Sequence, residues 1–449
     1  MISITDIEKA MNVKIPISHG MREAFQLWND MFCNKAYWIG SDVTGLNLPA
    51  SICSEVARIT LNDGKSWITS YSNSKRAEFL QKQYSEYMKH IRQDFENACA
   101  FGGMVFKPYV DGNKIKINAV PVDNVFPLEF DSSGNITDVI FVDTKQYGKY
   151  VFTRLERHTF FASNKTYQVT NTAFLGDNNN SLIRKYDIRH IPEWENLVES
   201  IILPNIEKPL FSVFKYPGNN NIDRNSPLGM SCFSKAVDQI KQADTQWALI
   251  MWEYNGSQLA VDAPEDMFMR DSNGNLRMPQ RMQRLFRTNN FDCNRDVPLK
   301  VFSPAIRDQS LFNGFNKILL EIEFNCGLAY GSLSDQKTIE KTAEEVRAGK
   351  ERSRATAKDI QSALEDSLLH VIWIMNTYAD LYKLAPEGDY EAVFEWGEGC
   401  NKDIDQEFDK RFRLCSSGCL KKEKFIAWYF GCSEKEALDY LPDAENNFI

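Results

Sequence analysis

The chain has 449 residues, too many for one ordinary hydrophobic core, so we expect two or more domains or one elongated subunit. Its hydrophobic share of 43% and charged share of 25% are typical of a folded protein. The formal net charge of -9 argues against a protein that grips DNA by neutralising phosphates, but it does not exclude a channel through which DNA slides.

The sequence predicts no membrane span and no secretion. No run of about 18 apolar residues is present, which is the length that a spanning helix needs. Residues 1–10 are of mixed polarity and lack the pattern of a signal peptide. The ten scattered cysteines are therefore expected to be reduced thiols in a cytosolic setting.

The first half of the chain predicts helices followed by strands. Apolar residues recur three and four apart across residues 20–101, with one longer helix at 74–100 that Gly102-Gly103 ends. The period then changes to two around Asp111-Gly112-Asn113, a hairpin signal. Further strand pairs turn at 132–135 and 163–165, so an antiparallel meander is expected to about residue 175, followed by a loop at 177–180.

The second half predicts long helices. Ser226-Pro227 and Ser303-Pro304 each have a capping serine followed by proline, which indicates two helix starts on either side of an irregular stretch. A polar break at 331–337 follows the second of these helices. Residues 338–384 then contain no proline and predict one helix of roughly 70 Å, at about 1.5 Å per residue, which must brace something large.

The first half of that long helix is highly charged. A helix that is polar all round does not lie in the core of its own subunit. The basic residues between 347 and 358 are candidates for contact with DNA, but interleaved glutamates favour a surface of paired charges four residues apart.

Motifs for catalysis and metal binding are absent from the sequence. It lacks a phosphate-binding loop, a nucleophile elbow and a zinc-protease motif, and its five histidines are far apart. Cys400, Cys415, Cys419 and Cys432 are spaced too loosely for a typical zinc site, and the acidic residues of 403–409 favour a solvated helix start over calcium. We therefore predict no catalytic residue, no metal and no cofactor, and we interpret His370 as a packed or interfacial side chain.

Several stretches resemble the portal proteins of long-tailed bacteriophages and prophages of Gram-positive bacteria. The most extensive is CGLAYGSLSDQKTIEKTAEEVR at 326–347, and others are DRNSPLGMS at 223–231 and SGCLKKEKFI at 417–426. The order of expected elements is similar over nearly the whole chain. The resemblance implies an elongated α+β fold, mainly helical, that assembles as a ring of about twelve copies at one vertex of a phage head.

The resemblance also implies a part for each segment and a set of partners. The segments are a wing (1–225, helical and then antiparallel β), a stem helix (226–256), a clip (257–302), a second stem helix (303–330), a tunnel loop (331–337), a long helix (338–385) and a crown (386–449). The implied partners are double-stranded DNA in the channel, the terminase large subunit, a head–tail adaptor, the scaffold and the major capsid protein. The protein is then expected in the virion, and in the host cytoplasm during assembly.

The tunnel loop and its flank hold the residues that we expect to face DNA. They are Ser334, Asp335, Gln336, Lys337, Thr338 and Lys341, of which the two lysines are the strongest candidates. Two other functions stay open from sequence alone. One is a different head–tail ring protein of the virion, although adaptors are usually much shorter. The other is a carboxylate-dependent hydrolase, which rests only on the abundance of Asp and Glu.

Overall fold

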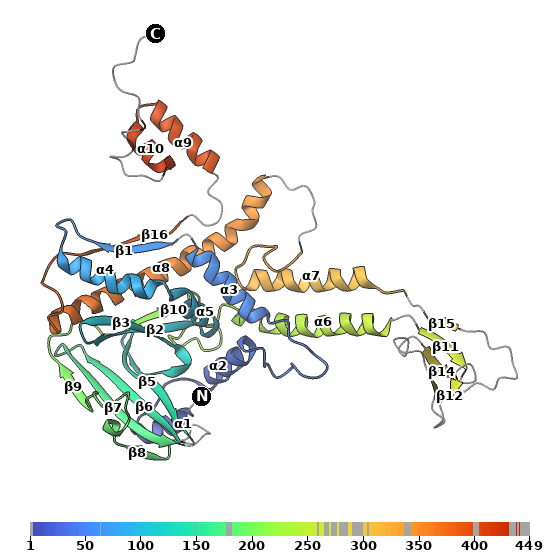
Figure 1. Cartoon of the computed structure of the whole chain (residues 1–449), viewed down its shortest axis with the longest axis horizontal. Coiled ribbons are helices and arrows are strands. Elements are labelled where there is room, and N and C mark those ends of the chain that lie inside the picture. Colours follow the sequence, from blue (N-terminus) through green and yellow to red (C-terminus); the bar gives the residue numbers. More distant parts are fainter. Residues whose placement is uncertain are drawn as a thin grey trace, which may run out of the picture.

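The computed structural model describes residues 3–62, 64–148, 150–176, 182–257, 260–264, 269–270, 276–277, 286–289, 300–302, 305–335, 343–397 and 404–430, with Ala437 and Tyr440. Its described part is an α+β structure with five sheets, in which every strand pairing is antiparallel except β11–β14. Figure 1 shows a body of sheets and helices, two long helices that project from it side by side, and a small helical pair that stands apart. The expected α+β class is confirmed.

The N-terminal helices are α1 (Ile4–Met11), α2 (His19–Phe32), α3 (Leu48–Leu61), α4 (Lys75–Met88) and α5 (Ile91–Phe101). The single long helix expected at 74–100 is wrong, because the chain breaks at Lys89 and His90 between α4 and α5. The break lets α5 turn and bury its own apolar face, which includes Phe95 and Cys99. No glycine or proline marks this break in the sequence.

The expected hairpin is present and is the centre of one sheet. Strand β2 (Gly103–Asp111) pairs with β3 (Lys114–Pro121) from Met104–Pro121 to Asp111–Lys114. A third strand, β10 (Ser212–Lys215), pairs with the other edge of β2, and the sequence did not predict it. Gly102 precedes the sheet with φ 81°, and a side chain there would lie 2.5 Å from the backbone of Met230. This position therefore requires glycine.

The expected meander forms a second, six-stranded sheet. Strands β4 (Val125–Phe130), β5 (Ile136–Tyr147), β6 (Tyr150–Phe161) and β7 (Thr166–Gly176) pair in sequence order, which confirms the prediction to residue 175. Two short strands, β8 (Arg184–Tyr186) and β9 (Ser200–Leu203), both pair with β7 and were not predicted. The loop expected at 177–180 lies outside the described residues.

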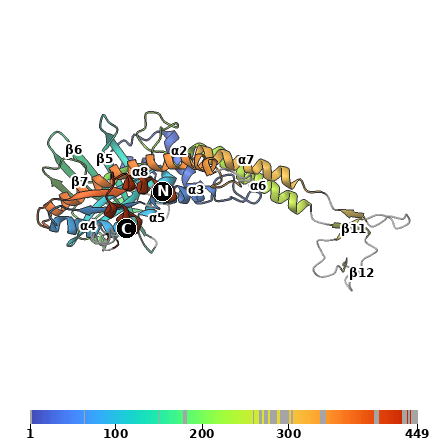
Figure 2. The same ribbon diagram turned by 90° about the horizontal axis from the view of Figure 1, so that it is seen from above.

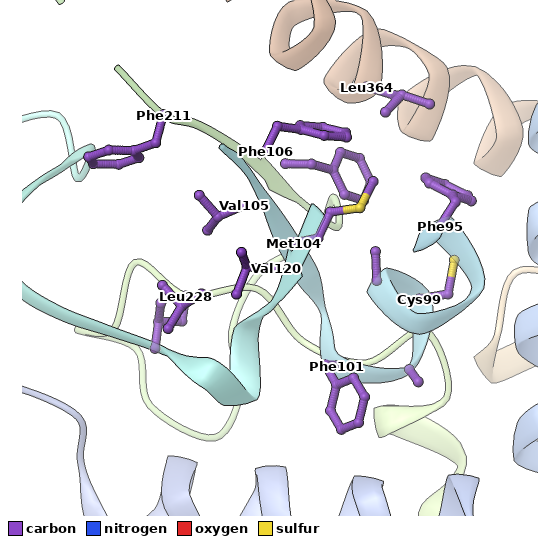
Figure 3. Packing of buried hydrophobic residues seen from close by; sticks show 14 of the residues in the cluster. Phe95, Cys99, Phe101, Met104, Val105, Phe106, Val120, Phe211, Leu228 and Leu364 are labelled. Atoms are coloured by element: carbon purple, nitrogen blue, oxygen red, sulfur yellow. The ribbon is translucent and has the colours of Figure 1, made fainter. Parts of the chain in front are cut away.

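The long helix α8 (Ala343–Leu381) crosses the body and has the expected buried stripe. Its 39 residues span about 58 Å at about 1.5 Å per residue. Leu364 belongs to the same buried cluster as Phe95 of α5 and Phe106 of β2, as Figure 3 shows. Residues 338–342 lie outside the described part of the chain, and the helix ends at Leu381 instead of the expected 384.

Beyond α8, the chain returns to the body before it reaches the C-terminal helices. Strand β16 (Glu391–Glu395) pairs with β1 (Lys65–Thr69), which lies in the stretch expected to be wholly helical. The two strands are more than 300 residues apart, so only the tertiary fold brings them together. Helices α9 (Ile404–Ser416) and α10 (Lys422–Phe430) follow and pack on each other.

The helix start expected at Ser226-Pro227 is wrong, because helix α6 covers Val237–Gly256. Ser226 instead accepts a hydrogen bond from the Leu228 amide (3.3 Å) in a turn. The chain then passes against the end of α5, where the Cys232 amide donates to the Cys99 carbonyl at 2.9 Å. A helix over 226–236 would lose this close approach.

The second projecting helix, α7, covers Asp308–Asn325, and the predicted start at 303–304 lies outside the described residues. It ends at Asn325, earlier than the expected 330. The stretch between α6 and α7, expected to be irregular, includes five short strands: β11 (Ala260–Pro264), β12 (Met269–Arg270), β13 (Leu276–Arg277), β14 (Phe286–Asn289) and β15 (Lys300–Phe302). They lie at the far end of the projecting helices (Figure 2).

Candidate functional site

The projecting helices α6 and α7 form an antiparallel pair that is held along its length. Near the body, the ring centroids of Trp247 and Phe315 lie 5.6 Å apart. Further out, the Arg307 guanidinium pairs with the Glu253 carboxylate at 3.1 Å. The 20 residues of α6 span about 30 Å at about 1.5 Å per residue, so the pair reaches well beyond the body.

A buried carboxylate joins α6 to the body. Asp244 is almost fully buried, and its two oxygens accept from the Trp38 indole N–H and from the Leu46 amide, each at 2.8 Å. Both donors lie in the segment between α2 and α3. A carboxylate that accepts two such bonds sets the direction in which the helix leaves the body.

Apolar side chains on the projecting pair face solvent. Trp252 is 69% exposed and Leu249 is 52% exposed on α6, and Phe312 and Phe324 are also exposed on α7. Several large exposed apolar groups on one thin projection mark a surface for protein contact, since isolated monomers rarely expose such groups together. The pair therefore presents exposed apolar groups on both of its helices.

The loop after α7 is held by one buried carboxylate. Glu323 is 0% exposed, and its Oε1 accepts from the amides of Leu333 (2.6 Å) and Ser334 (2.8 Å). The Gly331 amide (3.1 Å) and the Ser334 hydroxyl (2.8 Å) complete the set of donors to this carboxylate. Residues 331–334 thus surround the Glu323 side chain, which holds them against the C-terminal end of α7.

Helix α8 holds the same loop from the other side. The Thr356 hydroxyl donates to the Gly327 carbonyl at 2.9 Å, and the Ala329 amide donates to the Ser353 hydroxyl at 2.5 Å. The Arg352 guanidinium lies 4.0 Å from the ring centroid of Phe324 and donates to that residue's carbonyl. These contacts tie Arg352 to α7 and do not test the charge pairs four residues apart that the sequence predicted for the basic run.

The expected DNA-facing residues fall into three groups. The hydroxyl of Ser334 is buried against Glu323, so this side chain does not project from the loop. Asp335 is exposed, and its backbone exchanges two hydrogen bonds with the side chain of Asn316. Gln336, Lys337, Thr338 and Lys341 lie outside the described residues.

The role of Glu323 was not predicted, although the sequence contains a signal for it. Glu323 occupies a position on the apolar face of α7, four residues after Leu319 and next to Ile322. A carboxylate on such a face, shortly before the glycine- and serine-rich GSLS, indicates an acceptor for loop amides.

A histidine of the six-stranded sheet contacts both a tyrosine and a glutamate. His158 lies 2.6 Å from the Tyr167 hydroxyl through Nδ1 and 2.8 Å from Glu156 Oε1 through Nε2. Burial lowers the pKa of His158 and raises that of Tyr167. Burial also acts to raise the pKa of Glu156, but nearby Lys107 and the other cations hold it well below its usual value. His158 and Tyr167 are buried and the Glu156 side chain is only 13% exposed, so the network joins neighbouring strands inside the sheet.

The cysteines considered for a metal do not form a centre in the described part of the chain. Cys415 and Cys419 are free thiols, and Cys400 and Cys432 lie outside the described residues. The described ranges contain no group of three or more His, Cys, Asp or Glu that could hold a metal ion. The buried thiols of Cys53 and Cys232 lie 3.7 Å apart, within reach of a weak hydrogen bond between reduced cysteines.

A cavity with a volume of about 670 Å³ lies between strands β4 and β10 and helix α8. His370 lines it, and the Nε2 atom of this histidine has no hydrogen-bond partner in the structure. Burial, with a contribution from Lys208, lowers the pKa of His370 to about 4. The packed histidine expected from sequence is thus seen, in its neutral form at neutral pH.

Comparison with protein families and with curated proteins finds no match for this chain. Among the described helices, none has the length and apolar character needed to cross a lipid bilayer.

Proposed function

We propose that this chain is the portal subunit of a tailed bacteriophage, which assembles as a ring of about twelve copies around a channel for DNA. One observation carries the proposal: a body with a rigidly attached pair of long antiparallel helices, capped by small strands. In the portal arrangement, α6 and α7 are the stem, the strands β11–β15 belong to the clip, and α8 joins the stem to the wing.

The exposed apolar side chains support assembly into a closed ring. In a head-to-tail ring, each copy presents one side of the helix pair to one neighbour and the opposite side to the other. Trp252 and Leu249 on α6, with Phe312 on α7, are then covered by neighbouring copies. Burial of apolar area contributes roughly 25 cal/mol per Å², so these groups favour association.

The acidic character of the chain supports a channel more than a clamp. The net charge of -9 repeats in every copy, and an acidic lumen repels the phosphates of DNA. Repulsion keeps the duplex free to slide, whereas many cations would hold it in place. The exposed carboxylate of Asp335, beside the loop that Glu323 fixes, is consistent with such a lining.

The proposal includes the partners of a portal. The clip side meets the terminase large subunit during packaging and a head–tail adaptor afterwards. The wing side meets the scaffold and the major capsid protein. In this proposal the protein acts as a structural ring in the virion, after assembly in the host cytoplasm, and the largely buried His158 network gives no support to the hydrolase alternative.

Mass photometry of Trp252→Ser tests the assembly surface. We expect the wild-type chain to form particles of about twelve subunits, and Trp252→Ser to shift them toward monomers, because the indole is lost from the interface. Tyr71→Ser is the control, since Tyr71 is also an exposed aromatic residue (91%, against 69% for Trp252) but lies on the body after β1. If both variants assemble as the wild type does, the helix pair is not part of the interface between copies.

A further inference from the structure

The turn between α9 and α10 concentrates positive charge in an acidic protein. Residues 410–424, here called the cationic turn, contain six lysines and arginines and one glutamate, a net charge of +5. The whole chain carries -9, so the remaining residues carry -14. The cations are Lys410, Arg411, Arg413, Lys421, Lys422 and Lys424.

An aromatic core holds the two helices so that these cations share one end of the pair. The ring of Phe408 on α9 lies 5.4 Å from that of Phe425 on α10, and Phe408 stacks with Phe412 at 5.8 Å. The Arg411 guanidinium lies 4.6 Å from the centroid of Trp428. The last turns of α9 and the first turn of α10 are therefore neighbours, and their charges add.

Most of this charge faces solvent. Lys410, Arg413, Lys421 and Lys422 are all exposed, and Gly418 with φ 73° makes the tight turn between them. The α10 N-terminus adds the partial positive charge of the helix dipole at the same end. The pair stands apart from the sheets of the body in Figure 1, so the cationic turn is open to a large partner.

We propose that the cationic turn binds the phosphate backbone of double-stranded DNA. The proposal rests on the proposed portal function, which brings a duplex to the ring. A duplex carries one negative charge per about 1.7 Å of its axis, which suits several cations on one short turn. The remainder of the chain is acidic and repels DNA on average, which makes the cationic turn a favoured place for contact.

The ring multiplies this contact. Each copy presents one cationic turn, and a duplex that touches several copies at once gains affinity without any new type of contact. Individual contacts stay weak and sensitive to salt, because they are made by exposed side chains. The turn therefore guides DNA near the ring without trapping it, in keeping with a channel that repels phosphate.

The test compares two variants of the full-length protein with the same change in charge. Lys421→Gln with Lys422→Gln removes two exposed cations from the cationic turn. Arg184→Gln with Lys185→Gln removes two exposed cations from β8 on the body. Binding of a fluorescent DNA duplex is followed by anisotropy over a range of KCl concentrations, and assembly is followed by mass photometry.

We expect the turn variant to bind DNA at least tenfold more weakly at low salt, with a log–log salt dependence that is shallower by roughly 1.8 for two lost phosphate contacts. The β8 variant should match wild type. Equal affinity of the two variants would overturn the proposal. So would a turn variant that binds DNA normally but fails to assemble, since the cationic turn would then meet a second copy of this chain. Absence of rings in the wild type would instead reject the portal function itself.

Discussion

Replacement of Arg76 by methionine should loosen the attachment of α8 to the body. Arg76 is 1% exposed on α4, and its guanidinium donates to the carbonyls of Asn376, Ala385 and Pro386 at 2.9–3.1 Å. It also donates to the Asn376 amide oxygen at 2.9 Å and to Asp380 Oδ1 at 2.6 Å. One side chain thus fixes the end of α8 and the turn that leads to β16.

The loss of unfolding free energy in Arg76→Met depends on how well water replaces each hydrogen bond of the guanidinium. Removal of one partner from a fully buried ion pair costs about 3–5 kcal/mol. The Asp380 side chain is 48% exposed, so water solvates its carboxylate again and the ionic part of the loss is smaller. The three carbonyls and the amide oxygen lose about 1 kcal/mol each when their donor is removed, and partial relaxation reduces the sum. We therefore expect a loss of about 3 kcal/mol for Arg76→Met.

The assay is urea unfolding followed by far-UV circular dichroism, with Arg92→Met as the control. Arg92 pairs with Glu96 at 3.3 Å on the surface, where its side chain is 55% exposed, and such pairs contribute about 0–1 kcal/mol. Arg76→Met should lower the unfolding midpoint clearly and Arg92→Met hardly at all. Equal shifts in the two variants would refute the reasoning.

Two further predictions concern the buried carboxylate of the loop and the histidine of the cavity. Glu323→Ala removes the acceptor of the Gly331, Leu333 and Ser334 amides, so hydrogen exchange at 331–334 should speed up by more than tenfold while β2 and β3 stay protected; unchanged exchange would contradict the anchor. The pKa of His370, lowered to about 4 in the folded state, lies below its unfolded value near 6.5. The free energy of unfolding that neutral His370 contributes above pH 6.5 is therefore lost as the pH falls toward 4. The loss reaches roughly 1.4 kcal/mol at pH 5.5. His370→Gln should lose less between pH 7.5 and 5.5 in urea unfolding, and an identical loss in both proteins would reject the assignment.

The features that the sequence predicted correctly depend on local chemistry. The Asp111-Gly112-Asn113 turn specifies a hairpin through residues that tolerate left-handed backbone, and Gly112 has φ 59° in the structure. The end of α5 at Gly102 and the buried stripe of α8 are local in the same sense. Each signal lies within the element that it describes.

The features that the sequence missed depend on partners far along the chain. Strand β1 forms because β16 pairs with it, and β10 forms because the edge of β2 accepts it. Ser226-Pro227 has the chemistry of a helix start, yet its chain passes the end of α5 in an extended form because Gly229 lies against the Gly102 carbonyl. Tertiary contact overrides local preference at these places.

The candidate site shows the same division. A break after α7 was predicted, but the helix ends at Asn325, before the expected 331, and Gly327 and Gly331 both have positive φ there. The burial of Ser334 was not predicted, because it depends on a carboxylate in the preceding helix. The exposure of side chains in a loop depends on the residues that the loop packs against. The spacing of residues in the sequence does not reveal those neighbours.

Electron microscopy of the purified wild-type protein tests the central claim most directly. The portal proposal predicts rings of about twelve subunits with a central hole, in which α6 and α7 of each copy line the narrow part. Particles that remain single copies at micromolar concentration, with Trp252 and Leu249 still open to solvent, would contradict it.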